Sequence, residues 1–454
     1  MQYLGRFMFV LTLVVAPAVG CGDDAGKSIA VRPTELTKDT EEMRDGYTYI
    51  RYLARQPDFR DRESDGHVDQ KVEVAVPTGV ENDAPVIMLI DGEAPLWEGF
   101  LTIPEKLGWS SIYVQLEHRG YGQSLSDAAD QTVPDYVSAD NALRDAHGVV
   151  SKLRETYTGP WLAYGISYSG GLVIEYAGRF PDDVVGVLSS SGVIDWPLAN
   201  TSYDETTRER LGEQTYAQLA EHMKNLEPSE PFDANWVDRE FLQGIVAGIS
   251  QYASYQSLVP TFQGMVDTLS TEDLVANLRA LDEVASGGQA ADYAESRSAR
   301  TMTREQALEQ EPSWRVYFWQ QCTDIGTFNS SAQEPSIWQR GEPGWREDCR
   351  ELFDVELNTQ PRQQRSFVAD MERAGVPLVF LSGGNDPWRP LGLEVPPESA
   401  RIDEQPTWSV YEAAYGQHFH IPDGFHNPEA ADLPLAQAAF GALFDLAGVE
   451  REPL

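Results

Sequence analysis

Short apolar runs alternate with helix-like segments through the first half of the chain. Four of these runs are expected to be strands: Val86–Ile90, Ser111–Leu116, Trp161–Tyr164 and Val184–Leu188. Two weaker β-like segments come before them, at Thr48–Tyr52 and Val72–Val76. Helix-like stretches lie between the strands, at Phe100–Leu107, Ala139–Thr156 and Leu172–Arg179. This alternation predicts an α/β fold, in which a mostly parallel sheet is covered by helices on both faces.

The alternation stops in the middle of the chain. From about residue 197 to 350 the candidates are helical: Glu205–Asn225, Asp238–Tyr255, Thr271–Ala285 and Arg304–Trp319. Strand-like runs resume at Pro377–Leu381 and near Trp408–Ala414, and a helix-like run, Leu435–Ala447, follows. We therefore expect a core formed by residues 45–196 and 351–454, with residues 197–350 inserted as a helical cap.

One segment, Tyr164–Gly171, joins an expected strand to an expected helix and contains two serines. A Gly-x-Ser-x-Ser turn in this context is typical of a nucleophile elbow, with Ser167 at the apex. A serine hydroxyl is a weak nucleophile, so it must project from a tight turn near a base and backbone N–H groups. Ser169 stands where the pattern requires a small residue, so Ser167 is the candidate nucleophile. The alternative is a Gly/Ser-rich turn without chemistry.

A serine nucleophile also requires a base and a carboxylate that orients it. After an elbow, the chain order is serine, acid, histidine. Asp386 follows the expected strand Val376–Leu381 and is the candidate acid, or else a plain turn aspartate before proline. His426, in a loop before the last helix, is the candidate base. His418 and His420 are its rivals, and His420 alternates with apolar neighbours as on a strand.

The remaining histidines come too early in the chain for this order and are interpreted as surface or structural residues: His67, His118, His147 and His222. An oxyanion hole is expected from the backbone N–H of Tyr168 and from the loop after Val86–Ile90, at Gly92 or Glu93.

The N-terminus has the pattern of a signal peptide over residues 1–21. Arg6 supplies a positive charge, and the apolar run Phe7–Val15 is shorter than the roughly 20 residues of a membrane span. Ala18–Cys21 is similar to a bacterial lipobox, which implies lipidation at Cys21 and a polar tether over residues 22–44. The alternative is ordinary cleavage after a small residue.

The chain is strongly acidic, with 72 Asp and Glu against 34 Lys and Arg and a net charge of −38. This charge argues against nucleic acid and anionic lipid as partners, and membrane contact is expected only through the lipid anchor. The charge fits either a salty environment or a highly soluble exported protein. Cys322 and Cys349 form an even pair in an exported chain, which predicts a disulfide. Neither has further ligands at zinc spacing, and we expect no metal or cofactor.

Several separate segments together resemble the post-proline serine peptidases typified by lysosomal Pro-X carboxypeptidase and dipeptidyl peptidase II. They are the glycine–glutamate loop, the glutamate–histidine–arginine segment, the elbow, the segment after it, the tryptophan–glutamine–cysteine stretch and the acid motif: Gly92–Leu96, Glu117–Leu125, Ser167–Gly170, Ser189–Gly192, Trp319–Gly326 and Asn385–Trp388. The secreted bacterial prolyl tri- and tetrapeptidyl aminopeptidases share the Asp-Pro-Trp and late histidine elements and are a close second.

This resemblance implies an α/β-hydrolase core, a cap inserted after Ser189–Gly192, and cleavage after proline at a peptide terminus by Ser167, Asp386 and His426. A proline pocket is expected to be aromatic, with Trp388 as a wall and Trp314 or Trp319 contributed by the cap, although each tryptophan also fits ordinary core packing.

Glu93 is a candidate for binding the free α-amine of a peptide substrate, which would make the enzyme aminopeptidase-like. Two other classes stay open: a carboxylesterase or lipase on the same fold, and a catalytically silent surface-binding lipoprotein.

Overall fold

The computed structural model describes most of the chain: residues 34–58, 66–93, 109–124, 135–227, 234–251, 258–286, 313–331, 333–338, 341–383, 386–393, 408–413 and 433–451. Several predictions lie outside these residues, namely the signal peptide with Cys21, the helix over Phe100–Leu107, and the candidate bases His418, His420 and His426. Among the described helices, none combines the length and apolar character that a membrane span requires.

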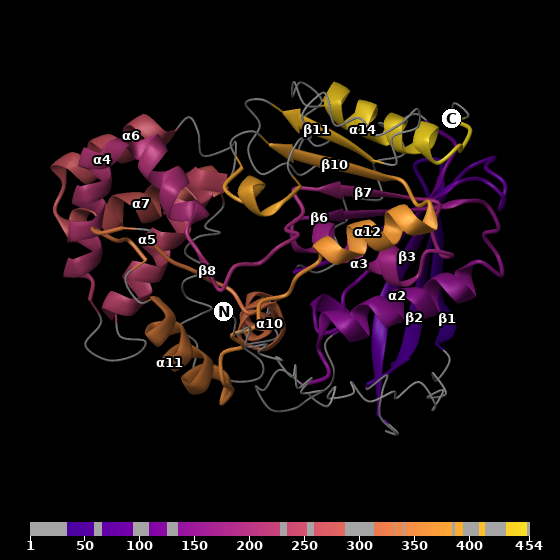
Figure 1. Cartoon of the computed structure of the whole chain (residues 1–454), viewed down its shortest axis with the longest axis horizontal. Helices are drawn as coiled ribbons and strands as arrows, with labels where there is room; N and C mark the ends of the chain where they lie inside the picture. The colour runs from indigo at the N-terminus through magenta and orange to yellow at the C-terminus, as the bar shows by residue number, and fades with distance from the viewer. Residues whose placement is uncertain are drawn as a thin grey trace, which may run out of the picture.

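The central sheet has nine strands in the order β1-β2-β3-β5-β4-β6-β7-β10-β11 (Figure 1). The first half of the chain contributes seven of them, β1 Glu35–Arg44, β2 Tyr47–Pro57, β3 His67–Pro77, β4 Val86–Ile90, β5 Ile112–Leu116, β6 Trp161–Ile166 and β7 Gly186–Ser190. The last two are β10 Leu378–Gly383 and β11 Trp408–Ala413. Pairing is antiparallel from β1 to β5 and parallel from β5 to β11. This arrangement confirms the predicted α/β-hydrolase core.

The central strands are apolar on both sides because helices cover both faces of the sheet. Every residue of β4 and β5 is buried, as is typical of parallel strands. Val86 and Met88 face a core formed with α2 Ala139–Leu153, α3 Tyr168–Arg179 and α12 Arg365–Ala374. The alternate residues, Ile87 and Leu89, pack with α14 Leu433–Leu446 on the other face. Figure 1 shows α14 separated by the sheet from α2, α3 and α12.

The first strand differs from the sequence prediction. The polar tether was expected over residues 22–44, but residues 35–44 form β1 at the edge of the sheet. Nearly every residue of β1 is exposed, so the strand has no apolar alternation by which it can be recognised. Asp45 and Gly46, both at positive φ, form the tight turn into β2.

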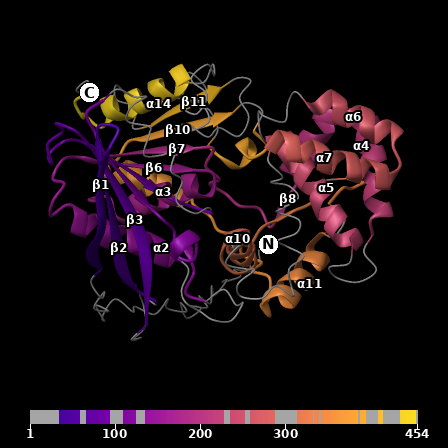
Figure 2. The same ribbon diagram turned by 180° about the vertical axis from the view of Figure 1, so that it is seen from behind.

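Most of the described residues between 197 and 350 are helical. The helices are α4 Ser202–Asn225, α5 Ala234–Gln251, α6 Val259–Thr268, α7 Thr271–Ser286, α10 Ser313–Gln320 and α11 Gly341–Phe353. The first four bury a hydrophobic cluster of their own, which includes Leu219, Phe241 and Phe262. Figures 1 and 2 show these four helices as a block beside the sheet. One short parallel pair, β8 Ala199–Asn200 with β9 Phe328–Asn329, was not predicted.

Candidate active site

Ser167 lies at the apex of the turn between β6 and α3. Its backbone has φ 56° and ψ −124°, a conformation that is strained for a residue with a Cβ. Two backbone hydrogen bonds hold it, because Ser167 N donates to Ser190 O at 2.9 Å and Gly170 N donates to Ser167 O at 3.0 Å. Strain of this kind persists only where the surroundings enforce it, and it makes the Ser167 side chain project from the strand end.

Small residues allow the turn to be this tight. A Cβ on Gly165 would lie 2.2 Å from the carbonyl oxygen of Ser169, and one on Gly170 would lie 2.6 Å from the Cα of Gly192. Both distances are too short for any side chain. Ser169 is itself 2% exposed. The strand, the helix and the segment after β7 therefore approach each other closely around Ser167.

The loop after β4 meets the elbow at the beginning of α3. Tyr168 is the first residue of this helix, where amide groups have no intrahelical partner. A Cβ on Gly92 would lie 3.1 Å from Ser169 N and 3.3 Å from a ring carbon of Tyr168. The structure thus brings the Gly92–Glu93 loop beside Tyr168, the two sources of the predicted oxyanion donors.

A second carboxylate lies just before this loop. Asp91 is 9% exposed, and its Oδ2 accepts a hydrogen bond of 2.8 Å from Gln115 Nε2. Burial raises the pKa of Asp91 well above its usual range, and the nearby Glu117 and Glu93 add to this effect. The carboxyl group of Asp91, just before the Gly92–Glu93 loop, therefore gives up its proton less readily than an exposed aspartate does.

Asp386 follows β10 and is 4% exposed. Its Oδ1 accepts from Trp388 N at 2.9 Å, and its carbonyl accepts from Arg389 N at 3.1 Å, so the aspartate is fixed by its own turn. Strands β6, β7 and β10 are parallel neighbours. Ser167 follows β6 and Asp386 follows β10, so both residues lie where the parallel strands have their carboxyl ends. The candidate base, His426, is outside the described residues and stays a prediction.

Aromatic rings continue from the elbow to the inserted helices. Trp196 lies 6.4 Å from Tyr168 and 5.5 Å from Trp388 between ring centroids, and Trp388 lies 5.1 Å from Tyr203 of α4. Trp388, two residues after Asp386, is therefore part of an aromatic series beside the candidate site. Trp319 instead packs in a hydrophobic cluster with Tyr121 and Val137, which is a core position. The Trp314 side chain is not among those described.

The chain matches the family model described as Serine carboxypeptidase S28 over residues 77–227. The probable serine protease EDA2 of Arabidopsis thaliana is 24% identical over 345 residues, covering 68% of each chain. The lysosomal Pro-X carboxypeptidase of Pongo abelii is 30% identical over 122 residues, 25% of this chain and 23% of that one. A solved proline iminopeptidase of Mycobacterium smegmatis has 14% identity and a TM-score of 0.40, over 83% of this chain and 96% of that chain. The chain is a serine hydrolase related to the S28 peptidases.

In this S28-related chain, the Cys322–Cys349 disulfide is formed, as predicted. Both cysteines are fully buried, and the bridge joins the segment after α10 to α11. Two of the histidines that precede the candidate acid in the chain have structural partners. His147 bonds to Asp183, and His222 bonds to Thr271 and to the carbonyl of Val266.

His118, interpreted from sequence as structural, packs near the elbow. It is 2% exposed, its Nδ1 lies 2.7 Å from the carbonyl of Arg119, and its ring centroid is 6.2 Å from that of Tyr168. Nδ1 must donate to that carbonyl, so the ring is the Nδ1–H tautomer and Nε2 is an acceptor. Burial lowers the pKa of His118 to about 4 and keeps the ring neutral. Its place in the glutamate–histidine–arginine segment was the only sequence signal for this position.

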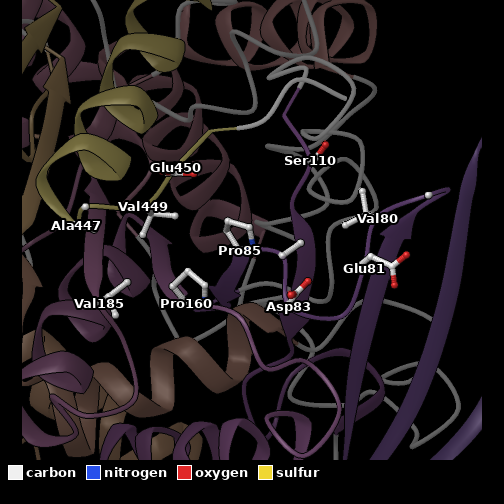
Figure 3. A pocket seen from close by; sticks show the side chains of 13 residues that line it. Val80, Glu81, Asp83, Pro85, Ser110, Pro160, Val185, Ala447, Val449 and Glu450 are labelled. Carbon is white, nitrogen blue, oxygen red and sulfur yellow. The ribbon is translucent and has the colours of Figure 1, made fainter.

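A cavity of about 490 Å³ lies elsewhere on the core (Figure 3). Its lining includes Pro85, Pro160 and Val185, which come directly before β4, β6 and β7. It therefore opens at the amino ends of the parallel strands, opposite the edge that carries Ser167 and Asp386. The cavity does not belong to the candidate active site.

Proposed function

We propose that the protein is an exported serine exopeptidase that cleaves peptide bonds after proline, with Ser167, His426 and Asp386 as its catalytic residues. The observation that carries this proposal is the strained backbone of Ser167 at the apex of its turn, at the carboxyl ends of the parallel strands, where Asp386 also lies. The S28 match and the relatives named as serine proteases support peptide substrates.

In the proposed reaction, His426 takes the proton of Ser167 as the Oγ bonds to the scissile carbonyl carbon. Asp386 orients His426 and stabilises its charged form. The negative oxygen of the tetrahedral intermediate accepts from the Tyr168 amide and from the Gly92–Glu93 loop. His426 then gives the proton to the leaving amine as the C–N bond breaks. Water, activated by the same histidine, releases the acyl group from Ser167.

Proline specificity is supported by the aromatic series of Trp196, Trp388 and Tyr203. A proline ring is rigid and apolar, and it packs well on aromatic side chains. Glu93 continues the oxyanion loop, so its carboxylate is suited to bind the α-amine of a short N-terminal segment. We therefore favour aminopeptidase-like cleavage. Cleavage at a C-terminus is the alternative, because the matched family and a relative from Arthroderma benhamiae are named serine carboxypeptidases.

An esterase is the second candidate function, since the same elbow and acid serve acyl esters as well. For localisation, we propose export directed by residues 1–21 and anchoring through lipid on Cys21. The extracellular and lysosomal relatives are in keeping with export.

The test is an activity profile of the chain from residue 22 onward, with Ser167→Ala as control. Proline-containing peptides blocked at one end or the other, and a short ester, are offered in low and high salt. Cleavage after proline that requires a free N-terminus supports an aminopeptidase, and a requirement for a free C-terminus supports a carboxypeptidase. Turnover of the ester alone would reject the peptidase. Full activity of Ser167→Ala would reject the mechanism.

A further inference from the structure

Gln320 bridges two buried tyrosines beside the elbow. It is the last residue of α10 and is fully buried. Its Oε1 accepts from the hydroxyl of Tyr121, and its Nε2 donates to the hydroxyl of Tyr168 at 3.4 Å. Burial raises the pKa of both tyrosines well above the usual range, so both phenols keep their protons. One amide therefore spans the space between the glutamate–histidine–arginine segment and the start of α3.

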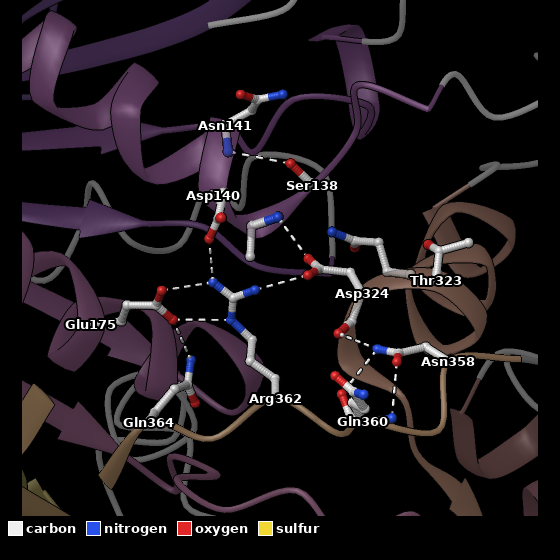
Figure 4. Close-up of polar contacts among 12 residues, drawn as sticks. Ser138, Asp140, Asn141, Glu175, Thr323, Asp324, Asn358, Gln360, Arg362 and Gln364 are labelled. Carbon is white, nitrogen blue, oxygen red and sulfur yellow. Dashed lines mark hydrogen bonds and ion pairs between the residues drawn. The ribbon is translucent and has the colours of Figure 1, made fainter. Parts of the chain in front are cut away.

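The segment after Gln320 is held at nearly every residue. Residues Gln321–Ile325 form a π-helix, η4, a conformation found often at functional sites. Cys322 is joined to Cys349, and its carbonyl accepts from Asn358 N at 2.6 Å. The carboxylate of Asp324 accepts from Ala139 N and from Arg362, each at 2.8 Å. Figure 4 shows that Arg362 also reaches Asp140 of α2 and Glu175 of α3. Gln320 is thus held in a rigid frame.

Tyr168 is held from several sides. The Gly92 backbone lies against its ring, with a distance of 3.3 Å from the position of a Gly92 Cβ to a ring carbon. Trp196 and Tyr317 pack beside the ring at 6.4 and 6.0 Å between centroids. Gln320 donates a hydrogen bond to the Tyr168 hydroxyl. Tyr168 directly follows Ser167, so contacts that fix the Tyr168 side chain also hold its Cα, and a shift of that Cα would move the amide beside the nucleophile.

We propose that Gln320 is a positioning residue for the oxyanion hole, because it holds the Tyr168 phenol and thereby orients the amide that follows Ser167. This inference rests on the proposed function. The amide stabilises charge that develops only in the transition state. Loss of its orientation is therefore expected to lower kcat and leave KM nearly unchanged, since ground-state binding does not depend on it.

The test uses the full mature chain and four variants. Gln320→Met keeps the side-chain length and removes both hydrogen bonds, whereas Tyr168→Phe removes only the hydroxyl of Tyr168. The matched control is Gln263→Met in α6, whose amide donates to Leu211 O at 3.0 Å within the inserted block. Measurements are kcat and KM on the best substrate of the profile above, the rate of Ser167 labelling by a fluorophosphonate, and the melting temperature.

We expect Gln320→Met and Tyr168→Phe each to lower kcat and the labelling rate about tenfold, with KM within about twofold and Gln263→Met unchanged. The double variant should be no slower than Tyr168→Phe alone, because both substitutions remove one shared interaction. Additive losses in kcat, or a change confined to KM, would overturn the inference. So would wild-type rates in both single variants. If Gln320→Met fails to fold, Tyr168→Phe alone decides the outcome by its kcat and KM. A wild-type chain that neither labels at Ser167 nor turns over substrate would reject the proposed function itself, and this inference with it.

Discussion

The hydroxyl of Ser169 is bonded to both polar groups of the Ile166 backbone. It donates to the carbonyl of Ile166 and accepts from the amide of the same residue, each at 2.8 Å. Ser169, two residues after the apex, therefore closes the turn, and its hydroxyl is used in these two structural hydrogen bonds. The hydroxyl of Ser167 has no such bond to the start of α3.

We predict different effects for the two serines. Ser169→Ala leaves the Ile166 amide and carbonyl without this partner, at a cost of about 1–3 kcal/mol in the free energy of unfolding. Ser167→Ala is expected to leave stability unchanged, or to raise it, and to abolish fluorophosphonate labelling. Urea unfolding and labelling of both variants measure this contrast. Loss of labelling in Ser169→Ala at wild-type stability would contradict the assignment of the nucleophile.

Gly165 is predicted to tolerate no side chain. In Gly165→Ala the new Cβ would lie 2.2 Å from a backbone oxygen, so the turn must shift, and we expect a loss of more than about 2 kcal/mol together with most activity. The control is Gly264→Ala in α6, where a Cβ meets no atom within 4 Å. That variant should gain up to about 1 kcal/mol from helix propensity. Melting temperatures of the two variants check the prediction, and equal temperatures would refute it.

His118 is predicted to make stability depend on pH. Burial lowers its pKa to about 4 in the folded chain. The charges of Arg119 and Arg362 act in the same direction, whereas the hydrogen bond to the Arg119 carbonyl and the charge of Asp145 oppose the shift. Because the unfolded chain binds a proton more readily, this contribution is fully present above about pH 6.5 and is lost as the pH falls toward 4. It amounts to at most about 3 kcal/mol.

The measurement is urea unfolding of the wild type and of His118→Asn at pH 7.5 and pH 5. The difference between the two proteins isolates His118 from the many carboxylates that titrate in the same range. We expect the wild type to lose more stability than the variant on acidification. Parallel losses in the two proteins would show that His118 does not titrate as inferred.

Arg362 is predicted to be the most sensitive charged residue of the described chain. Arg362→Met removes the ion-pair partner that the buried Glu175 shares with the mostly buried Asp324, although Glu175 keeps its pair with Arg179. Removal of one side of a buried ion pair costs about 3–5 kcal/mol, and we expect a loss near the lower end of this range. The control is Arg350→Met, which breaks an ion pair with Glu356 in which both side chains are more than half exposed. No measurable change is expected there. Calorimetric melting of both variants tests this, and equal effects would contradict it.

Local patterns made the elbow and the central strands predictable. Ser167, its glycines and the apolar runs on either side are close in sequence, so the turn and its flanking strand and helix follow from one short segment. Asp386 could be predicted for the same reason, since it directly follows a recognisable strand. The disulfide followed from there being only two cysteines beyond Cys21.

Other features depend on contacts between residues that are far apart in the sequence, and no local pattern predicts such contacts. Arg362 joins Asp140, Glu175 and Asp324, which come from three separate parts of the chain. The bridge from Gln320 to Tyr121 and Tyr168 is similar, and a π-helix has no periodicity that sequence patterns detect. Edge strand β1 was missed because its side chains are polar on both faces.

The order of the strands has a consequence for how such a protein can diversify. The chain leaves the sheet after β7 and returns to it at β10, and these two strands are hydrogen-bonded neighbours. Helices α4 to α7 have their own apolar cluster, and the described residues between β7 and β10 add no strand to the nine-stranded sheet. Insertions, deletions or a wholesale exchange of this block therefore leave the pairing of the sheet intact. Changes in this one inserted segment can therefore alter the surroundings of Ser167 during evolution, while the turn that holds Ser167 stays the same.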